Sequence, residues 1–132
     1  MVGVDAFKSV FRRQLDGLLE AARTKFGDPD VTVRGEALEK LWDAWERLKT
    51  IEHGSNKSQQ VTALLTNAVP EPNFRGKIDA EAHVLTGMGN EFTIRHFETN
   101  KQPLAESEYV DYLFHRMFAL LWLLLKRTNR LT

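Results

Sequence analysis

The sequence predicts a single all-α domain, a compact bundle of four to five helices that spans residues 1–132. Apolar residues recur three and four positions apart along several long segments, as they do on one face of a helix. Glycine and proline residues separate these segments, and no stretch shows the apolar–polar alternation of a strand. With 42% hydrophobic and 27% charged residues, the composition is that of an ordinary globular domain, which can stand alone or form one module of a longer natural protein.

The first predicted helix runs from Asp5 to Phe26. Gly27 ends it and is followed by Asp28 and Pro29. Glycine readily adopts the backbone conformation found just after a helix, and proline cannot continue a helix. The apolar side chains of this segment form one stripe, with charged residues on the other side. They are Phe7, Val10, Phe11, Leu15, Leu18, Leu19, Ala22 and Phe26.

The second predicted helix, Arg34–Ile51, carries a heavy aromatic stripe and is followed by the loop Gly54–Asn56. Trp42 and Trp45 lie three apart on that stripe, so we expect both in or beside the core, with Trp42 the more buried. The third predicted helix, Ser58–Ala68, is shorter, and its apolar residues again share one face.

The fourth predicted helix begins between Asn73 and Lys77, after a break at Pro72, and runs to about Phe97. Gly87 and Gly89 fall inside it. A glycine inside a helix costs up to about 1 kcal/mol relative to alanine, so we expect either a close helix crossing or a local bend at this point.

The fifth predicted helix, Ser107–Arg127, has Ser107 as its expected N-cap. Its apolar run, Met117–Leu125, is too short to span a membrane, which requires about 20 residues. A helix that is apolar on all sides needs partners on every side. It is therefore either the central helix of the bundle or a helix that also packs against a second chain, and we expect a homodimer through the fourth and fifth helices.

Several function classes are disfavoured by composition. Lysine plus arginine equals aspartate plus glutamate, at 18 each, so the chain lacks the basic excess of proteins that coat duplex nucleic acid. Cysteine is absent, which removes disulfides and thiolate metal sites. We expect a cytoplasmic protein that is not inserted in a membrane and uses no cofactor.

The four histidines do not pair at the helical spacing of metal ligands, so no metal site is expected. His53 is interpreted as an exposed residue at a helix end, and His83 as a surface or boundary residue. His115 lies on the apolar fifth helix, so we expect it to be a hydrogen-bonded core or boundary residue. His96 remains as the candidate for chemistry.

A polar cluster at the end of the fourth predicted helix contains the candidate catalytic residues Arg95, His96, Glu98 and Lys101. Arginine suits phosphate, and histidine can move a proton near neutral pH. A histidine beside cations is what RNA cleavage through the ribose 2′-hydroxyl requires, without a metal. Alternatively, cations at a helix C-terminus stabilise its dipole, and Glu98 simply neutralises one of them.

This cluster, followed by a short loop and an aromatic-rich final helix at Tyr109–Phe114, resembles the HEPN superfamily, and within it the helical domains of prokaryotic abortive-infection proteins. The resemblance implies a helical bundle that commonly dimerises. It also implies a metal-independent ribonuclease of the kind found in toxin, antiviral defence and RNA-processing systems. The implied motif is an arginine, often followed by Asn, Asp or His, and then a histidine after four to six residues, with two copies meeting across the dimer.

The match is partial. Arg95 and His96 fit the opening of the motif, but the histidine expected at positions 100 to 102 is replaced by Asn100, Lys101 and Gln102. One hypothesis is therefore cleavage of RNA, with Arg95 on the scissile phosphate, His96 as general acid or base, Lys101 as an auxiliary cation and Glu98 orienting one of them. The other is a non-catalytic module that uses the same fold for dimerisation or for docking a further protein partner.

Overall fold

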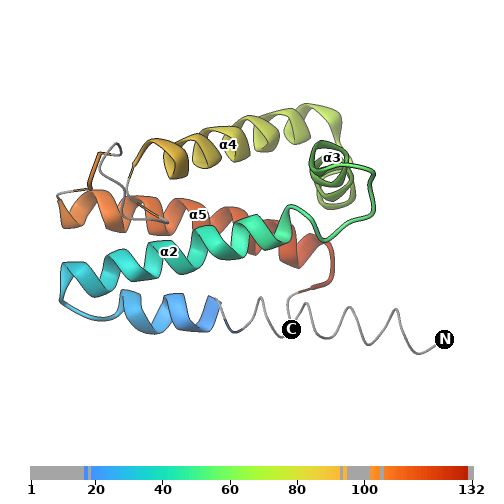
Figure 1. Cartoon of the computed structure of the whole chain (residues 1–132). Helices are drawn as coiled ribbons and strands as arrows, with labels where there is room; N and C mark the ends of the chain where they lie inside the picture. Colours follow the sequence, from blue (N-terminus) through green and yellow to red (C-terminus); the bar gives the residue numbers. More distant parts are fainter. Residues whose placement is uncertain (1–16, 18, 93, 95–101, 105, 131–132) are drawn as a thin grey trace.

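A computed structural model describes residues 17, 19–92, 94, 102–104 and 106–130 (Figure 1). Within these ranges the secondary structure is helical, which confirms the predicted all-α bundle. The helices are α2 (Val31–Leu48), α3 (Lys57–Ala68), α4 (Pro72–Glu91) and α5 (Ser107–Arg127), and a further helical segment at residues 19–26 precedes them. The predicted end of the first helix at Phe26 is confirmed, whereas most of its predicted stripe lies outside the described residues.

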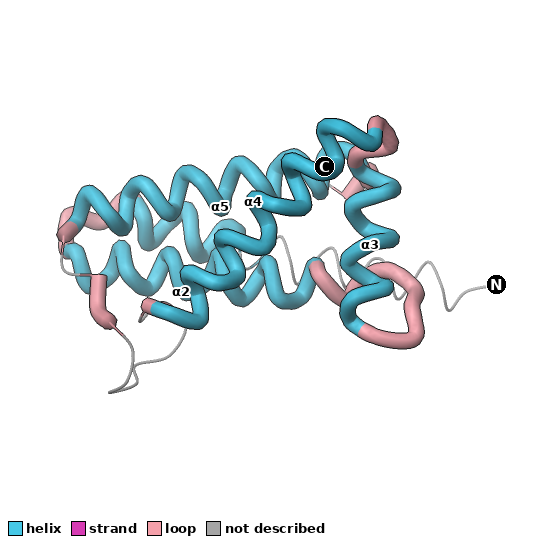
Figure 2. Tube along the Cα trace, turned by 90° about the horizontal axis from the view of Figure 1, so that it is seen from above, coloured by secondary structure: helices cyan, strands magenta, loops and turns pink. Residues whose placement is uncertain are grey.

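Helix α5 is the centre of the bundle and packs against α2, α3 and α4. Figure 1 shows α2 and α5 running side by side in the same direction, with α4 returning in the opposite direction above them. Seen from above in Figure 2, α3 crosses the end of this arrangement. The central position is one of the two possibilities that the sequence left open for this helix, and the packed helices and the segment 19–26 cover much of its apolar surface.

Ion pairs join separate segments of the bundle, and three of them are partly buried on both sides. Arg34 of α2 pairs with Asp111 of α5. Arg116 of α5 donates two hydrogen bonds of 3.0 Å from Nε to the two carboxylate oxygens of Glu81 on α4. Close to the other end, Arg130 Nη2 lies 2.8 Å from Glu52 Oε1. All three pairs are partly shielded from solvent, so each fixes one helix relative to another more firmly than an exposed pair would.

Three of the four bounded helices start at a side-chain cap. Asp30 caps α2 by accepting from the Thr32 backbone at 2.8 Å, and Asn56 caps α3. Glu71 caps α4 through the amides of Asn73 and Phe74, with a proline at the first helical position. Helix α5 has Glu106 at its N-cap without a side-chain hydrogen bond, so the prediction of Ser107 as the cap is wrong: Ser107 is the first residue inside the helix.

Two predicted boundaries require correction. Helix α2 occupies Val31–Leu48 and not Arg34–Ile51, because Asp30 starts it three residues earlier and the chain leaves the helix at Lys49. Helix α4 ends at Glu91 and does not run to Phe97: Phe92 has extended backbone (φ −105°, ψ 162°) while its N–H still donates to Met88. The bounds of α5 match the prediction, and those of α3 differ by one residue.

The tryptophans of α2 form the core contact with α4. Trp42 and Trp45 are each 1% exposed, so both are buried as expected, although Trp42 is no more buried than Trp45. Trp42 Nε1 donates to the Leu85 carbonyl at 3.0 Å, and Trp45 Nε1 donates to Thr86 Oγ1 at 2.9 Å. Two indole hydrogen bonds to consecutive residues therefore set the position of α4 against α2.

Among the described residues, no helix combines the length and the apolar character needed to cross a membrane.

Candidate functional site

The predicted catalytic cluster lies outside the described residues: Arg95, His96, Glu98 and Lys101 all belong to the range 95–101. The residues on either side of it are described. Gln102 N donates to the Glu91 carbonyl at 3.3 Å, and Phe92 and Gln102 form an isolated β-bridge. The chain thus leaves the end of α4 and returns to the same point ten residues later.

A groove of about 450 Å³, called here the aromatic groove, lies where the chain returns. Its lining combines the end of α4, the residues before α5 and the first turns of α5: Met88, Phe92, Gln102, Pro103, Leu104, Tyr109, Tyr112 and Leu113. Tyr109 is 57% exposed and Tyr112 60% exposed. Exposed tyrosine rings three residues apart on a helix offer flat apolar faces on which a planar group can stack.

Arg116 lies against Tyr112, one of the residues that line the aromatic groove. Its guanidinium carbon lies 5.8 Å from the centre of the Tyr112 ring. Hydrogen bonds from Arg116 to Glu81 raise the pKa of the arginine above its ordinary value, although burial acts in the opposite direction. The guanidinium is therefore permanently charged and held by Glu81, and it supports Tyr112 in place.

The three described histidines have separate surroundings. His53 and His83 are exposed, as expected. The expectation that His115 belongs to the core or its boundary is wrong: the residue is exposed, and its ring makes edge contacts with Phe26 and Phe114. The reason is the phase of α5, which turns Phe114 inward and leaves position 115 on the outer side.

Sequence reasoning missed a second groove, called here the polar groove, of about 660 Å³ between α2, α3 and α4. Its lining includes Trp45 of α2 and Lys49, which directly follows that helix. Helix α3 contributes Lys57 and Val61, and α4 contributes Asp79, Ala82, His83 and Gly87. The one sequence signal for it is Lys49, a cation four residues after Trp45 and thus on the apolar stripe of the second helix.

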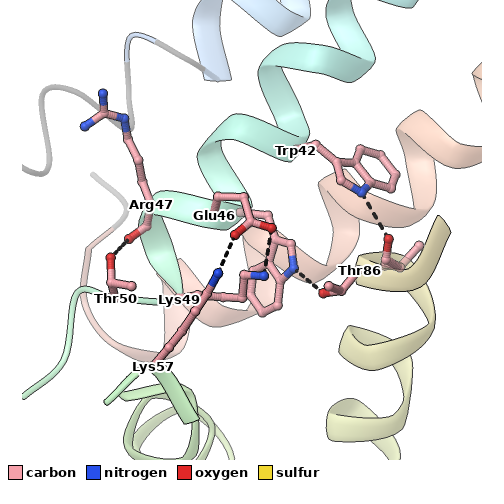
Figure 3. Close-up of polar contacts among 9 residues, drawn as sticks. Trp42, Glu46, Arg47, Lys49, Thr50, Lys57 and Thr86 are labelled. Carbon is pink, nitrogen blue, oxygen red and sulfur yellow. Dashed lines mark hydrogen bonds and ion pairs between the residues drawn. The ribbon is translucent and has the colours of Figure 1, made fainter. Parts of the chain in front are cut away.

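A charged triad adjoins the polar groove, and two of its members, Lys49 and Lys57, line the groove. Lys49 Nζ donates to Glu46 Oε1 at 2.8 Å, and Lys57 Nζ donates to Glu46 Oε2 at 2.9 Å (Figure 3). Burial raises the pKa of Glu46, but the hydrogen bonds from the two lysines outweigh it, so the pKa lies below its ordinary value. Burial lowers the pKa of Lys49, and Glu46 opposes this shift.

Among the described residues, no cluster of three or more His, Asp and Glu side chains has the arrangement of a metal site.

Comparison with known proteins adds no relative: no family model, no curated protein and no solved structure matches this chain. The fold defines the class of protein as a small all-α bundle, whose described residues form an aromatic groove and a polar groove. Any function has to be argued from these features.

Proposed function

We propose that this chain is a HEPN-like domain of a prokaryotic defence system that acts on RNA as a metal-independent ribonuclease. The observation that supports the proposal is the contact between Glu91 and Gln102 beside the aromatic groove. The residues between them include Arg95, His96 and Lys101, so a cationic segment begins and ends next to exposed tyrosine rings.

Aromatic side chains beside cations are a common means of holding single-stranded RNA. Unpaired bases stack on the rings, each contributing about 1–3 kcal/mol, while cations neutralise the phosphates. Glu91, Glu106 and Glu108 are exposed near the same ends of the segment and oppose an RNA backbone. The attraction for phosphate must therefore come from Arg95 and Lys101.

In the proposed reaction the ribose 2′-oxygen bonds to phosphorus as the bond to the 5′-oxygen breaks. Arg95 holds the phosphate, and His96 takes the proton from the 2′-hydroxyl or delivers one to the departing 5′-oxygen. Lys101 stabilises the charge that builds on the phosphorane, and Glu98 orients one of these groups. The products are a 2′,3′-cyclic phosphate and a free 5′-hydroxyl.

The test is incubation of the purified chain with single-stranded RNA, once with EDTA and once with magnesium. We expect cleavage in both and cyclic-phosphate ends on the products. DNA of the same sequence and a fully 2′-O-methylated RNA are matched controls, because neither has the attacking hydroxyl and both should stay intact. RNAs of varied sequence that remain whole under both conditions would remove the catalytic proposal.

A second candidate function is a non-catalytic module that uses α5 for dimerisation or for docking a protein. The observation that favours it is Trp122, a large apolar side chain that is 50% exposed on α5. Large exposed aromatic side chains are frequent anchors of protein interfaces. The absence of a histidine at positions 100 to 102 points the same way.

A further inference from the structure

Among the described residues, the linings of the polar groove and of the aromatic groove have no member in common. Its volume of about 660 Å³ lies in the range of pockets that hold small molecules. One part of the lining is apolar, at Val61 and Ala82, and another is charged, at Lys49 and Lys57. A ligand that fills it should combine an apolar body with a charged group.

Lys49 is the central observation. The residue is 6% exposed and lines the groove. An ammonium group has three N–H donors. Among the described residues, the only acceptor within hydrogen-bond distance of Lys49 Nζ is Glu46, and the nitrogen also lies 5.4 Å from the centre of the Trp45 ring. The Lys49 ammonium, although nearly buried, therefore keeps N–H groups that can donate to a ligand in the groove.

The charges of the triad indicate the sign of that group. Glu46 shares one carboxylate between Lys49 and Lys57, with one oxygen on each ammonium, as Figure 3 shows. The lowered pKa of Glu46 keeps it ionised at neutral pH. Two ammonium groups and one carboxylate leave one positive charge in excess, and a partly buried excess charge is stabilised by a counter-ion.

The opposite wall carries a carboxylate. Asp79 Oδ1 lies 3.5 Å from His83 Nδ1, and the Asp79 side chain is 48% exposed. The Asp79 carboxylate opposes an anion in the groove, although solvent screens it more effectively than it screens Lys49. The removal of this charge should therefore strengthen anion binding.

We propose that the polar groove binds a small organic oxyanion, a phosphate or carboxylate carried on a compact apolar body. The oxyanion accepts from Lys49 and Lys57, and the body packs on Val61 and Ala82. The proposal is independent of RNA cleavage, because it uses none of the residues of the proposed catalytic cluster.

Gly87 provides the decisive variant. It lines the groove, and an added Cβ would meet no atom within 4 Å, so a larger side chain fits the helix and projects into open space. Gly87→Leu should fill the groove without disturbing the core. Gly76→Leu is the matched control, since Gly76 also lies on α4 in open space but does not line the groove.

The experiment is a titration of the full ¹⁵N-labelled chain, followed by amide chemical shifts. The probes are phenyl phosphate and benzoate. Phenol is the uncharged control, and inorganic phosphate is the control that lacks an apolar body. We expect saturable shifts at Lys57, Ser58 and Gly87, with a dissociation constant on the order of 1 mM, as ordinary ligand efficiency allows for so small a probe. The anionic probe with the lower dissociation constant shows whether the groove prefers a phosphate or a carboxylate.

Charge variants provide the second arm. Lys57→Ala should weaken binding about five-fold and Asp79→Asn should strengthen it by about two- to five-fold, the range of partly exposed ionic contacts. Both side chains are exposed enough for the fold to tolerate the change. Three outcomes overturn the proposal: no saturable shift with either anion, shifts that persist in Gly87→Leu, or equal binding of phenol.

Discussion

Gly89 of α4 lies directly against the indole of Trp42. A Cβ built at Gly89 would stand 2.5 Å from Trp42 Cδ1 and 2.6 Å from Nε1, which is closer than real atoms approach. The same indole donates to the Leu85 carbonyl one turn earlier. The indole can therefore lie against α4 at this point only because position 89 has no side chain, which accounts for Gly89 but not for Gly87, where an added Cβ would meet open space.

The first prediction follows from this contact. Gly89→Ala should destabilise the protein by about 1–3 kcal/mol, because the buried indole has to move or α4 has to separate from α2. Gly87→Ala is the control: it meets open space, so it should stabilise α4 by up to about 1 kcal/mol through helix propensity. Urea denaturation measures both, and a similar change in the two variants would contradict the account.

The second prediction concerns the Trp42 side chain itself. Trp42→Ala should lower the free energy of unfolding by about 3–5 kcal/mol, because it leaves a large cavity in the core. Trp42→Phe keeps much of the apolar volume but removes the hydrogen bond to the Leu85 carbonyl, which contributes about 0.5–1.5 kcal/mol. A thermal midpoint that stays constant in Trp42→Ala would show that the tryptophan does not support the α2–α4 contact.

The third prediction concerns the oligomeric state. We expect a two-fold dimer through α4 and α5, in which the half-exposed Trp122 is an anchor. Trp122→Asp should shift the sedimentation coefficient at micromolar concentration from dimer to monomer with little change in helical signal, since a charge in an apolar interface opposes association. Thr66→Asp, on the exposed side of α3, should leave the dimer intact. A wild-type chain that sediments only as a monomer would contradict the prediction.

The fourth prediction concerns the loss of folding stability at acidic pH. The pKa of Glu46 is lowered as described, and backbone hydrogen bonds from Phe74 and Asn73 lower the pKa of Glu71. As pH falls, Glu46 and Glu71 are therefore protonated in the unfolded chain before they are protonated in the folded one. Both carboxylates stabilise the fold fully at pH values above their ordinary pKa of 4.5. This stabilisation is lost as pH falls through their lower folded-state pKa values.

Denaturant midpoints between pH 7 and pH 3 measure this loss. Glu71→Gln should be less stable at pH 7 and should also show a smaller drop on acidification than the wild type. A variant with an unchanged drop would show that the cap of α4 does not contribute to the acid dependence.

The fifth prediction concerns the proposed catalytic residues. His96→Ala should reduce the cleavage rate by about 10²- to 10⁴-fold, because proton transfer is lost. Arg95→Ala should remove positioning of the phosphate, whereas Lys101→Ala should have a smaller effect, because a compact cation can be partly replaced by solvent ions. Each variant must keep its helical signal and oligomeric state. Cleavage that persists in both His96→Ala and Arg95→Ala would assign the activity to other residues.

The success of the sequence predictions varies with how local the deciding interaction is. Helix α5 has the predicted bounds because its long apolar pattern and its charged ends determine it locally. The predicted start of α2 was wrong because it depends on the Asp30 cap, and the predicted end of α4 was wrong because it depends on the Phe92–Gln102 bridge. The proposed catalytic cluster stays a prediction, since it lies outside the described residues.

The sequence by itself determined the helical class and the burial of both tryptophans, because periodicity in a short window decides which face of a helix avoids water. The tertiary structure alone decided three other features: the contact of Gly89 with Trp42, the outward position of His115, and the meeting of Lys49 with Lys57 at Glu46. The physical reason is that each depends on how one helix is rotated or placed against another, and helix packing sets these relations between residues that are not neighbours on one helix face.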